Sequence, residues 1–278
     1  MVNGEFSGCL VYSRPLGHIQ PHSGLLRVPD DAQLLYKVMS VENLLRSVAG
    51  QYLHFNRVDS YVDFAAADGN DGAQLPMDRA ANAAAKFQKA PEYSALDYYD
   101  LSRARTYAAC LSTENSDAIW NKYGEGGSRG KVCVVFEFAK LRDALNKTLA
   151  PGNAALMYGD IQCNQVLSIN YGLIEYVNWE GHRTNEKYLS NPILYTYIKD
   201  AAQFGDEREL RISLSAIGIG QFKLADGSRM EFPPSLQLAF DYRGAILDGA
   251  IRQILLDPSV DSGLLGNQLG EFRIEWAK

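Results

Sequence analysis

The chain has 278 residues, of which 46% are hydrophobic and 22% are charged. This balance is typical of a globular protein with a sizeable core, and it excludes a chain that is mainly disordered. The formal net charge of -6 disfavours broad, nonspecific binding to nucleic-acid backbones, although it leaves room for a local basic patch.

The N-terminal sequence has no basic start followed by an apolar stretch, so we expect no signal peptide. No segment approaches the roughly 20 apolar residues that a membrane helix needs. The four cysteines, Cys9, Cys110, Cys133 and Cys163, form no CxxC pair, and we interpret Cys110 and Cys133 as core thiols. These features predict a soluble protein of the reducing cytoplasm with no membrane partner.

Hydrophobic periodicity, β-branched content and turn residues predict the following elements. In the first part of the chain, we expect an irregular arm over 1–30, a strand over 33–39, a helix from Ser40 to Gly50, a strand over 51–58, a loop over 65–76, and helical structure over 77–105 with a break near Pro91. In the middle, we expect a strand over 107–113, a helix from Ser116, a glycine-rich turn over 124–130, a strand over 131–138, a helix over 139–149, and strands over 154–161 and 165–177. In the last part, we expect a helix over 184–204, a strand over 209–216, a hairpin turn over 225–228, and strands over 236–242, 250–256 and 271–277. The loop over 65–76 is either a plain surface loop or a lid.

Helices are concentrated in the first two thirds of the chain and strands in the last two thirds, without regular alternation. This order predicts an α+β fold with a mixed or antiparallel sheet rather than a doubly wound parallel one. We find no linker and no internal repeat, so we expect residues 31–278 to form a single domain behind the arm.

One stretch, residues 204–213, raises a question about function. If it is a strand, Glu207, Glu209 and Arg211 share one face, while Leu210 and Ile212 share the other. The apolar face packs on a core. The polar face is either the solvated side of an edge strand or a functional site.

Several common catalytic motifs are absent: GxxxxGK[ST], HExxH and GxSxG do not occur. The glycine-rich residues 124–130 precede a strand, which is the wrong order for holding a phosphate at the start of a helix. The four histidines form no group in the sequence, and we expect no metal site.

Three segments, residues 34–57, 110–138 and 206–213, together resemble a bacterial domain family of unknown function. Its motifs are Leu-Tyr-Lys-Tyr, Trp-x-x-Tyr and Glu-x-Glu-Trp-Arg. The matching residues are Leu35-Tyr36-Lys37, Trp120 with Tyr123, and Glu207-Arg208-Glu209-Leu210-Arg211. Leu210 replaces the family's Trp, and its Asn-Asp-Pro-Phe-Glu element survives only as residues 62–64. The family is common in bacterial and phage genomes, so the resemblance implies a toxin or phage-defence role.

The same segments are similar to a divergent ADP-ribosyltransferase. That superfamily has an Arg or His on an early strand, a Ser-Thr-Ser-type strand in the middle and a catalytic Glu on a late strand. Here Lys37, the sequence Leu-Ser-Thr-Glu over 111–114, and Glu207-x-Glu209 take those places. The resemblance implies a split antiparallel β core with peripheral helices, and NAD as the substrate.

The resemblance also implies catalytic roles. Glu209 would stabilise the ribose cation that forms when NAD loses nicotinamide, and Ser112 would support Glu209 by hydrogen bonding. Glu207 would orient the acceptor or take its proton. Two carboxylates so close should raise one pKa, while Arg211 would keep Glu209 ionised.

The residues that the resemblance assigns to NAD binding are Tyr36, Lys37, Thr113, Trp120, Tyr123 and Arg211. Lys37 would hold a phosphate as a point charge, and Tyr36, Trp120 or Tyr123 would stack on nicotinamide or adenine. Structural alternatives exist for each: Lys37 on the surface, Thr113 at a strand end, and Trp120 and Tyr123 in the core.

Two functions follow. One is an NAD-consuming enzyme that transfers ADP-ribose to a protein or nucleic-acid acceptor, or hydrolyses NAD. The other is a non-catalytic binding module that keeps the same fold, which the substitutions at Lys37 and Leu210 favour.

Overall fold

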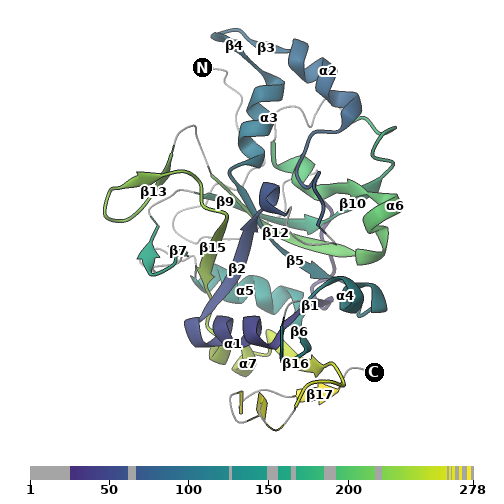
Figure 1. Cartoon of the computed structure of the whole chain (residues 1–278), viewed down its shortest axis with the longest axis vertical. Coiled ribbons are helices and arrows are strands. Elements are labelled where there is room, and N and C mark those ends of the chain that lie inside the picture. The colour runs from purple at the N-terminus through teal and green to yellow at the C-terminus, as the bar shows by residue number, and fades with distance from the viewer. Residues whose placement is uncertain are drawn as a thin grey trace.

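The structure is a computed structural model that describes residues 26–61, 67–124, 127–148, 156–163, 167–184, 192–216, 221–261, 263, 265–266, 269–270 and 274–276. Most of the predicted arm over 1–30 lies outside these residues. Within them the chain has a mixed α+β fold built on a mostly antiparallel sheet with several helices around it (Figure 1). The predicted α+β class with a mixed or antiparallel sheet is confirmed at this level.

Eleven strands form the large sheet among the described residues. They are β1 (Leu34–Ser40), β2 (Tyr52–Arg57), β5 (Thr106–Ser112), β6 (Lys131–Glu137), β7 (Leu156–Tyr158), β8 (Ile161–Gln162), β9 (Leu167–Leu173), β12 (Glu209–Ala216), β15 (Ser235–Ala239), β16 (Ile251–Leu256) and β17 (Ile274–Trp276). Three small sheets pair β3 (Lys86–Phe87) with β4 (Ala90–Ser94), β10 (Glu175–Val177) with β11 (Ile198–Asp200), and β13 (Phe222–Lys223) with β14 (Arg229–Met230).

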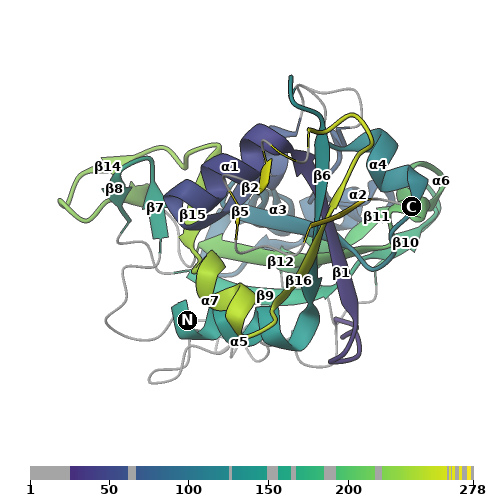
Figure 2. The same ribbon diagram turned by 90° about the horizontal axis from the view of Figure 1, so that it is seen from below.

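The helices are α1 (Val41–Gly50), α2 (Pro76–Ala84), α3 (Ala95–Arg103), α4 (Asp117–Lys122), α5 (Phe138–Thr148), α6 (Ala201–Phe204) and α7 (Tyr242–Leu247), with short 3-10 turns η1 (Val58–Ser60), η3 (Pro192–Tyr197) and η4 (Gly205–Glu207). Helices α2 and α3 lie with the β3–β4 hairpin at one end of the molecule (Figure 1). Helices α5 and α7 lie side by side (Figure 2).

Strand β5 is the branch point of the large sheet. The main path runs β17-β16-β6-β1-β5-β2-β15-β7-β8, while β12 pairs along the other edge of β5 and carries β9 beyond it. On the main-path edge, Ser112 of β5 faces Tyr36 of β1, and Ala108 faces Asn56 of β2. Two strands therefore share one edge of β5, and they diverge between these contacts.

Local sequence explains the elements that flank the branch point. The Ser40 hydroxyl accepts a hydrogen bond from the Asn43 backbone N–H at 3.2 Å and caps α1 as predicted, and α1 ends at Gly50. Strand β6 is rich in β-branched residues and is buried along most of its length. Leu210, Ile212 and Leu214 of β12 pack in the main hydrophobic core, which confirms the predicted apolar face.

One helix prediction is confirmed and one is wrong. Residues 77–105 form the helices α2 and α3 with the predicted break near Pro91 between them; the break is the β3–β4 hairpin, because proline is tolerated in a short edge strand but not in a helix interior. The described part of residues 184–204 forms η3, β11 and α6 instead of one helix. Tyr195, Tyr197 and Ile198 are all buried there, so tertiary packing outweighs the helical spacing.

Candidate functional site

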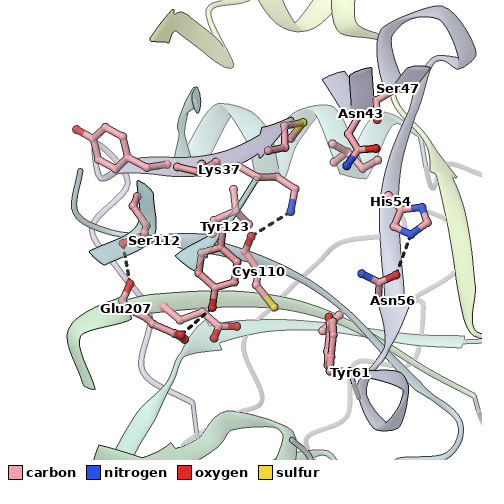
Figure 3. A pocket seen from close by; sticks show the side chains of 18 of the residues that line it. Lys37, Asn43, Ser47, His54, Asn56, Tyr61, Cys110, Ser112, Tyr123 and Glu207 are labelled. Atoms are coloured by element: carbon pink, nitrogen blue, oxygen red, sulfur yellow. Dashed lines mark hydrogen bonds between the residues drawn. The ribbon is translucent and has the colours of Figure 1, made fainter. Parts of the chain in front are cut away.

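A pocket of about 480 Å³ opens where β1 and β2 diverge along β5 (Figure 3). It is lined by residues from β1, α1, β2, β5, α4, β11, η4, β12, β15 and α7 and from the loop before α2. Lys37, Ser112 and Glu209 come from three different strands, and all three line this pocket. The sequence-based expectation that they open onto one cleft is therefore confirmed.

The inner end of the pocket holds carboxylates and cations. Glu209 begins β12 and is 3% exposed, and Arg211, next on the same face, is 0% exposed. Arg211 Nε donates to Glu209 Oε1 at 2.7 Å, and its Nη1 and Nη2 donate to the two oxygens of Asp71 at 2.5 and 3.1 Å. The polar face of β12 is buried, so its interpretation as a solvated edge strand is wrong.

Lys199 joins the two glutamates. Its Nζ lies 2.9 Å from Glu207 Oε2 and 2.8 Å from Glu209 Oε2. The other oxygen of Glu207, Oε1, accepts a hydrogen bond from the Tyr123 hydroxyl at 2.7 Å. We call Asp71, Lys199, Glu207, Glu209 and Arg211 the charged cluster.

The charged cluster keeps Glu209 ionised. Burial acts to raise the pKa of Glu209, but the positive charges of Arg211 and Lys199 outweigh it and hold that pKa below its usual range. Burial acts in the opposite direction on Lys199, and the negative charges around it, led by Glu209, raise the pKa of Lys199 well above its usual value. The expectation that Arg211 keeps Glu209 ionised agrees with this geometry. The two close carboxylates were expected to raise one pKa, and Glu209 is not the carboxylate whose pKa rises.

Glu207 is not part of the strand. It ends the 3-10 turn η4, and Arg208 then takes a left-handed conformation with φ of 47° before β12 starts at Glu209. The Thr113 backbone N–H and hydroxyl both donate to the Arg208 carbonyl, at 2.8 and 2.9 Å. The two glutamates therefore reach the same lysine from a turn and a strand, and the predicted alternation of Glu207 and Glu209 along one strand is wrong.

Ser112 holds this turn in place. It faces Glu209 in the β5–β12 register, but its hydroxyl lies 2.7 Å from the Glu207 backbone carbonyl and 2.9 Å from the Glu114 carbonyl, both of them acceptors. The expected hydrogen bond from Ser112 to the Glu209 carboxylate is therefore replaced by bonds to the backbone (Figure 3).

Lys37 reaches across the diverging strands. Its Nζ donates to the Cys110 carbonyl at 3.1 Å (Figure 3). Burial lowers the pKa of Lys37. Cys110 lines the pocket too, and burial raises the pKa of its thiol to about 12. Cys133 is fully buried, which confirms one of the two predicted core thiols; Cys110 is half-buried at the pocket wall.

The predicted NAD-binding residues divide into two groups. Tyr36, Lys37 and Tyr123 line the pocket, whereas Thr113, Trp120 and Arg211 do not. Trp120 is half-buried against the cluster of Cys133 and Val135, and its Nε1 donates to Asn115 Oδ1 at 2.8 Å, so it packs at the edge of a core cluster. Thr113 holds the turn before β12, and Arg211 lies behind Glu209.

The outer end of the pocket is polar and more exposed. It is formed by Asn43, Arg46, His54, Asn56 and Gln237. His54 Nε2 lies 2.8 Å from Asn56 Oδ1, and the His54 side chain is exposed. Sequence analysis assigned His54 no role, because its neighbour Gln237 is more than 180 residues away in the chain and only the pairing of β2 with β15 places it opposite His54.

Sequence analysis missed two members of the charged cluster. Lys199 lies inside the segment that we predicted as a helix, and its one local sign is a lysine next to the apolar residues Tyr197 and Ile198. Asp71 lies in the predicted loop over 65–76. Asp71, Gln74 and Leu75 are all buried, so the interpretation of this part as a plain surface loop is wrong.

Comparisons with known proteins add the following. No protein-family model and no curated protein matches the chain. A solved structure described as Thermus sp. 2.9 DarT in complex with ADP-ribosylated ssDNA is similar with a TM-score of 0.36 and 11% identity, over 91% of this chain and 98% of that chain. Among the described residues, no helix has the length and apolar character needed to cross a membrane, and no group of three His, Cys, Asp or Glu residues is placed to hold a metal ion.

Proposed function

We propose that the pocket binds NAD and that the protein breaks the nicotinamide–ribose bond, as an ADP-ribosyltransferase-like enzyme. The observation that supports this most is Glu209, a buried carboxylate that remains ionised and lines a pocket. Perturbed, buried charges that line a cleft are typical of functional sites. The proposal includes the ADP-ribosyltransferase form of the fold and a single domain over residues 31–278.

The chemistry requires a fixed negative charge beside the ribose. When the bond between the nicotinamide nitrogen and ribose C1′ breaks, its electron pair leaves with nicotinamide and C1′ becomes an oxocarbenium-like cation. The three carboxylates and two cations of the charged cluster leave one net negative charge. Because Arg211 and Lys199 already hold Glu209, it needs no rearrangement to stabilise that cation.

The second half of the reaction needs an acceptor and a base. A nucleophile attacks C1′ and loses a proton, and Glu207 is the carboxylate that we assign to take it. Lys37 supplies a positive charge to an NAD phosphate. We include water, a protein or a nucleic acid as the acceptor, and a role as a cytoplasmic bacterial or phage toxin or defence factor; these rest on the motif resemblance.

The test is an NAD-loss assay on the wild type, Glu209→Gln and Glu114→Gln. The control residue Glu114 lies close to the same turn, but its side chain is 61% exposed. We expect the wild type to release nicotinamide slowly, Glu209→Gln to lose at least ~100-fold of that rate, and Glu114→Gln to keep it. Unfolding curves must show that all three proteins are folded. A wild type that neither binds nor consumes NAD would refute the proposal.

A non-catalytic NAD-binding module is the second candidate. It is favoured by one observation: each oxygen of Glu209 already lies within 2.8 Å of a cation of the protein, Arg211 at Oε1 and Lys199 at Oε2. Calorimetric binding of NAD without any release of nicotinamide would select this candidate.

A further inference from the structure

Lys199 occupies an unusual position for a lysine. It is 4% exposed, and the parallel pairing of β10 with β11 fixes its backbone opposite Tyr176. Its Nζ bridges one oxygen of Glu207 and one of Glu209. We infer that Lys199 is the positioning residue of the site. By contacting both carboxylates, it keeps Glu209 anionic and holds the Glu209 carboxylate in a fixed orientation at the pocket. The inference rests on the proposed function.

The bridge has no substitute within the charged cluster. The second oxygen of each glutamate is held separately, Glu207 Oε1 by Tyr123 and Glu209 Oε1 by Arg211. These two attachments come from different elements and do not contact both carboxylates. Lys199 is therefore the residue of the charged cluster that links the carboxylate of Glu207, which ends a turn, to the carboxylate of Glu209, which begins a strand.

The remaining charges near the carboxylates are already shared. Arg211 also binds both oxygens of Asp71, and Lys122, 3.6 Å from Glu207 Oε1, lies closer to Asp206 at 2.7 Å. Other titratable groups act on Glu209 from the surrounding elements. The groups that act on or line this end of the pocket include Lys37, Tyr61, Asp68, Cys110, Tyr123, Tyr176 and Tyr197.

Without Lys199, the cluster would have three carboxylates and one cation, a net charge that is one unit more negative. Like charges this close favour protonation of one carboxylate. Since Glu209 must be ionised to stabilise the ribose cation, its loss of charge would stop the reaction at low pH. The wild-type cluster avoids this because the Glu209 pKa is held low.

The test compares Lys199→Met, Lys199→Arg and the surface control Lys147→Met, whose lysine pairs with Asp248 at 2.7 Å. In Lys199→Met we expect the acidic limb of the NAD-loss profile to move up by at least ~1 pH unit. We expect kcat at neutral pH to fall by about tenfold or more, with the KM for NAD within about threefold. Lys199→Arg should recover part of both effects, and Lys147→Met should match the wild type.

A second readout is independent of turnover. Titration of ¹³C-carboxyl-labelled glutamate by NMR, assigned with Glu209→Gln, reports the pKa of Glu209 directly. We expect a rise in Lys199→Met. If the wild type consumes no NAD, the proposed function fails, while this titration still decides whether Lys199 sets the charge of Glu209.

A third variant covers the case in which Lys199→Met does not fold. Glu207→Gln combined with Lys199→Met keeps the net charge of the wild-type cluster. We expect its Glu209 pKa to exceed that of Glu207→Gln alone. If removing Lys199 moves neither the acidic limb nor the Glu209 titration in any folded variant, the inference is overturned.

Discussion

Among the residues that the structure describes, carboxylates are buried in two places, and the contrast between them is informative. Asp78 of α2 is 4% exposed and accepts hydrogen bonds from the Thr184 hydroxyl at 2.7 Å and the Tyr195 hydroxyl at 3.1 Å. These donors are neutral, and Asp78 does not line the pocket described above. Glu209 is as deeply buried, but cations hold it and it opens onto that pocket.

Burial of an acid alone therefore does not indicate a functional site. Asp78 joins α2 to η3 and to Thr184, which is a structural role for neutral hydrogen bonds. A buried cation–carboxylate cluster is a poor way to stabilise a fold, because its desolvation cost offsets much of its attraction. Its retention at a pocket wall therefore favours a chemical role for Glu209.

The largest expected effect is on the charged cluster itself. Arg211→Met leaves Glu209 and Asp71 without their shared cation, so we expect the free energy of unfolding to fall by about 3–5 kcal/mol. Urea titration followed by circular dichroism measures it. Arg208→Met is the control, because Arg208 lies 3.8 Å from Glu114 with both side chains mostly exposed, and we expect a change within about 0.5 kcal/mol. Equal losses in the two variants would contradict the assigned role of Arg211.

An intermediate effect is expected at the neutral site. Asp78→Asn replaces one acceptor oxygen with a donor that faces the Thr184 and Tyr195 hydroxyls. We therefore expect the free energy of unfolding to fall by about 2 kcal/mol. NAD loss should stay at the wild-type rate once the protein is folded, in contrast to Glu209→Gln. Asp143→Asn, at an exposed position of α5, should change stability by less than about 0.5 kcal/mol. A loss of NAD turnover in folded Asp78→Asn would remove the distinction between the two sites.

The smallest expected effect concerns the pocket wall. Lys37→Met removes a positive charge but keeps the length of the side chain, so we expect the KM for NAD to rise about tenfold, equivalent to about 1.4 kcal/mol. The kcat should stay within about threefold. Lys131→Met is a matched control, since Lys131 also donates to a backbone carbonyl, that of Trp120 at 2.8 Å, but lies outside the pocket lining. An unchanged KM in Lys37→Met would exclude Lys37 from NAD binding.

Much of the sheet was predictable because its signals are local. The apolar and β-branched runs of β1, β6 and β12 and the Ser40 cap appear in the sequence within a few residues of the elements that they form. Glu209 and its partner Arg211 were also predictable, since a two-residue spacing places them on one face of a strand.

The rest of the site depends on contacts between distant segments. Asp71 meets Arg211 across 140 residues, and nothing near Asp71 in the sequence distinguishes it from a solvated loop aspartate. Lys199 was hidden because helical spacing in its segment was overruled by tertiary packing. Glu207 was assigned to the strand because an arginine at positive φ is rare, and so the turn at Arg208 has no sequence signature.

The divergence of β1 from β2 along β5 has one further consequence. A molecule bound in this pocket occupies the position where further backbone hydrogen bonds between β5 and its neighbouring strands would otherwise form. The width of the opening is thus a property of strand register, and substitution of wall residues changes polarity without closing it. Remodelling the aperture would require re-pairing the main chain, which makes its size far more resistant to point mutation than its chemistry.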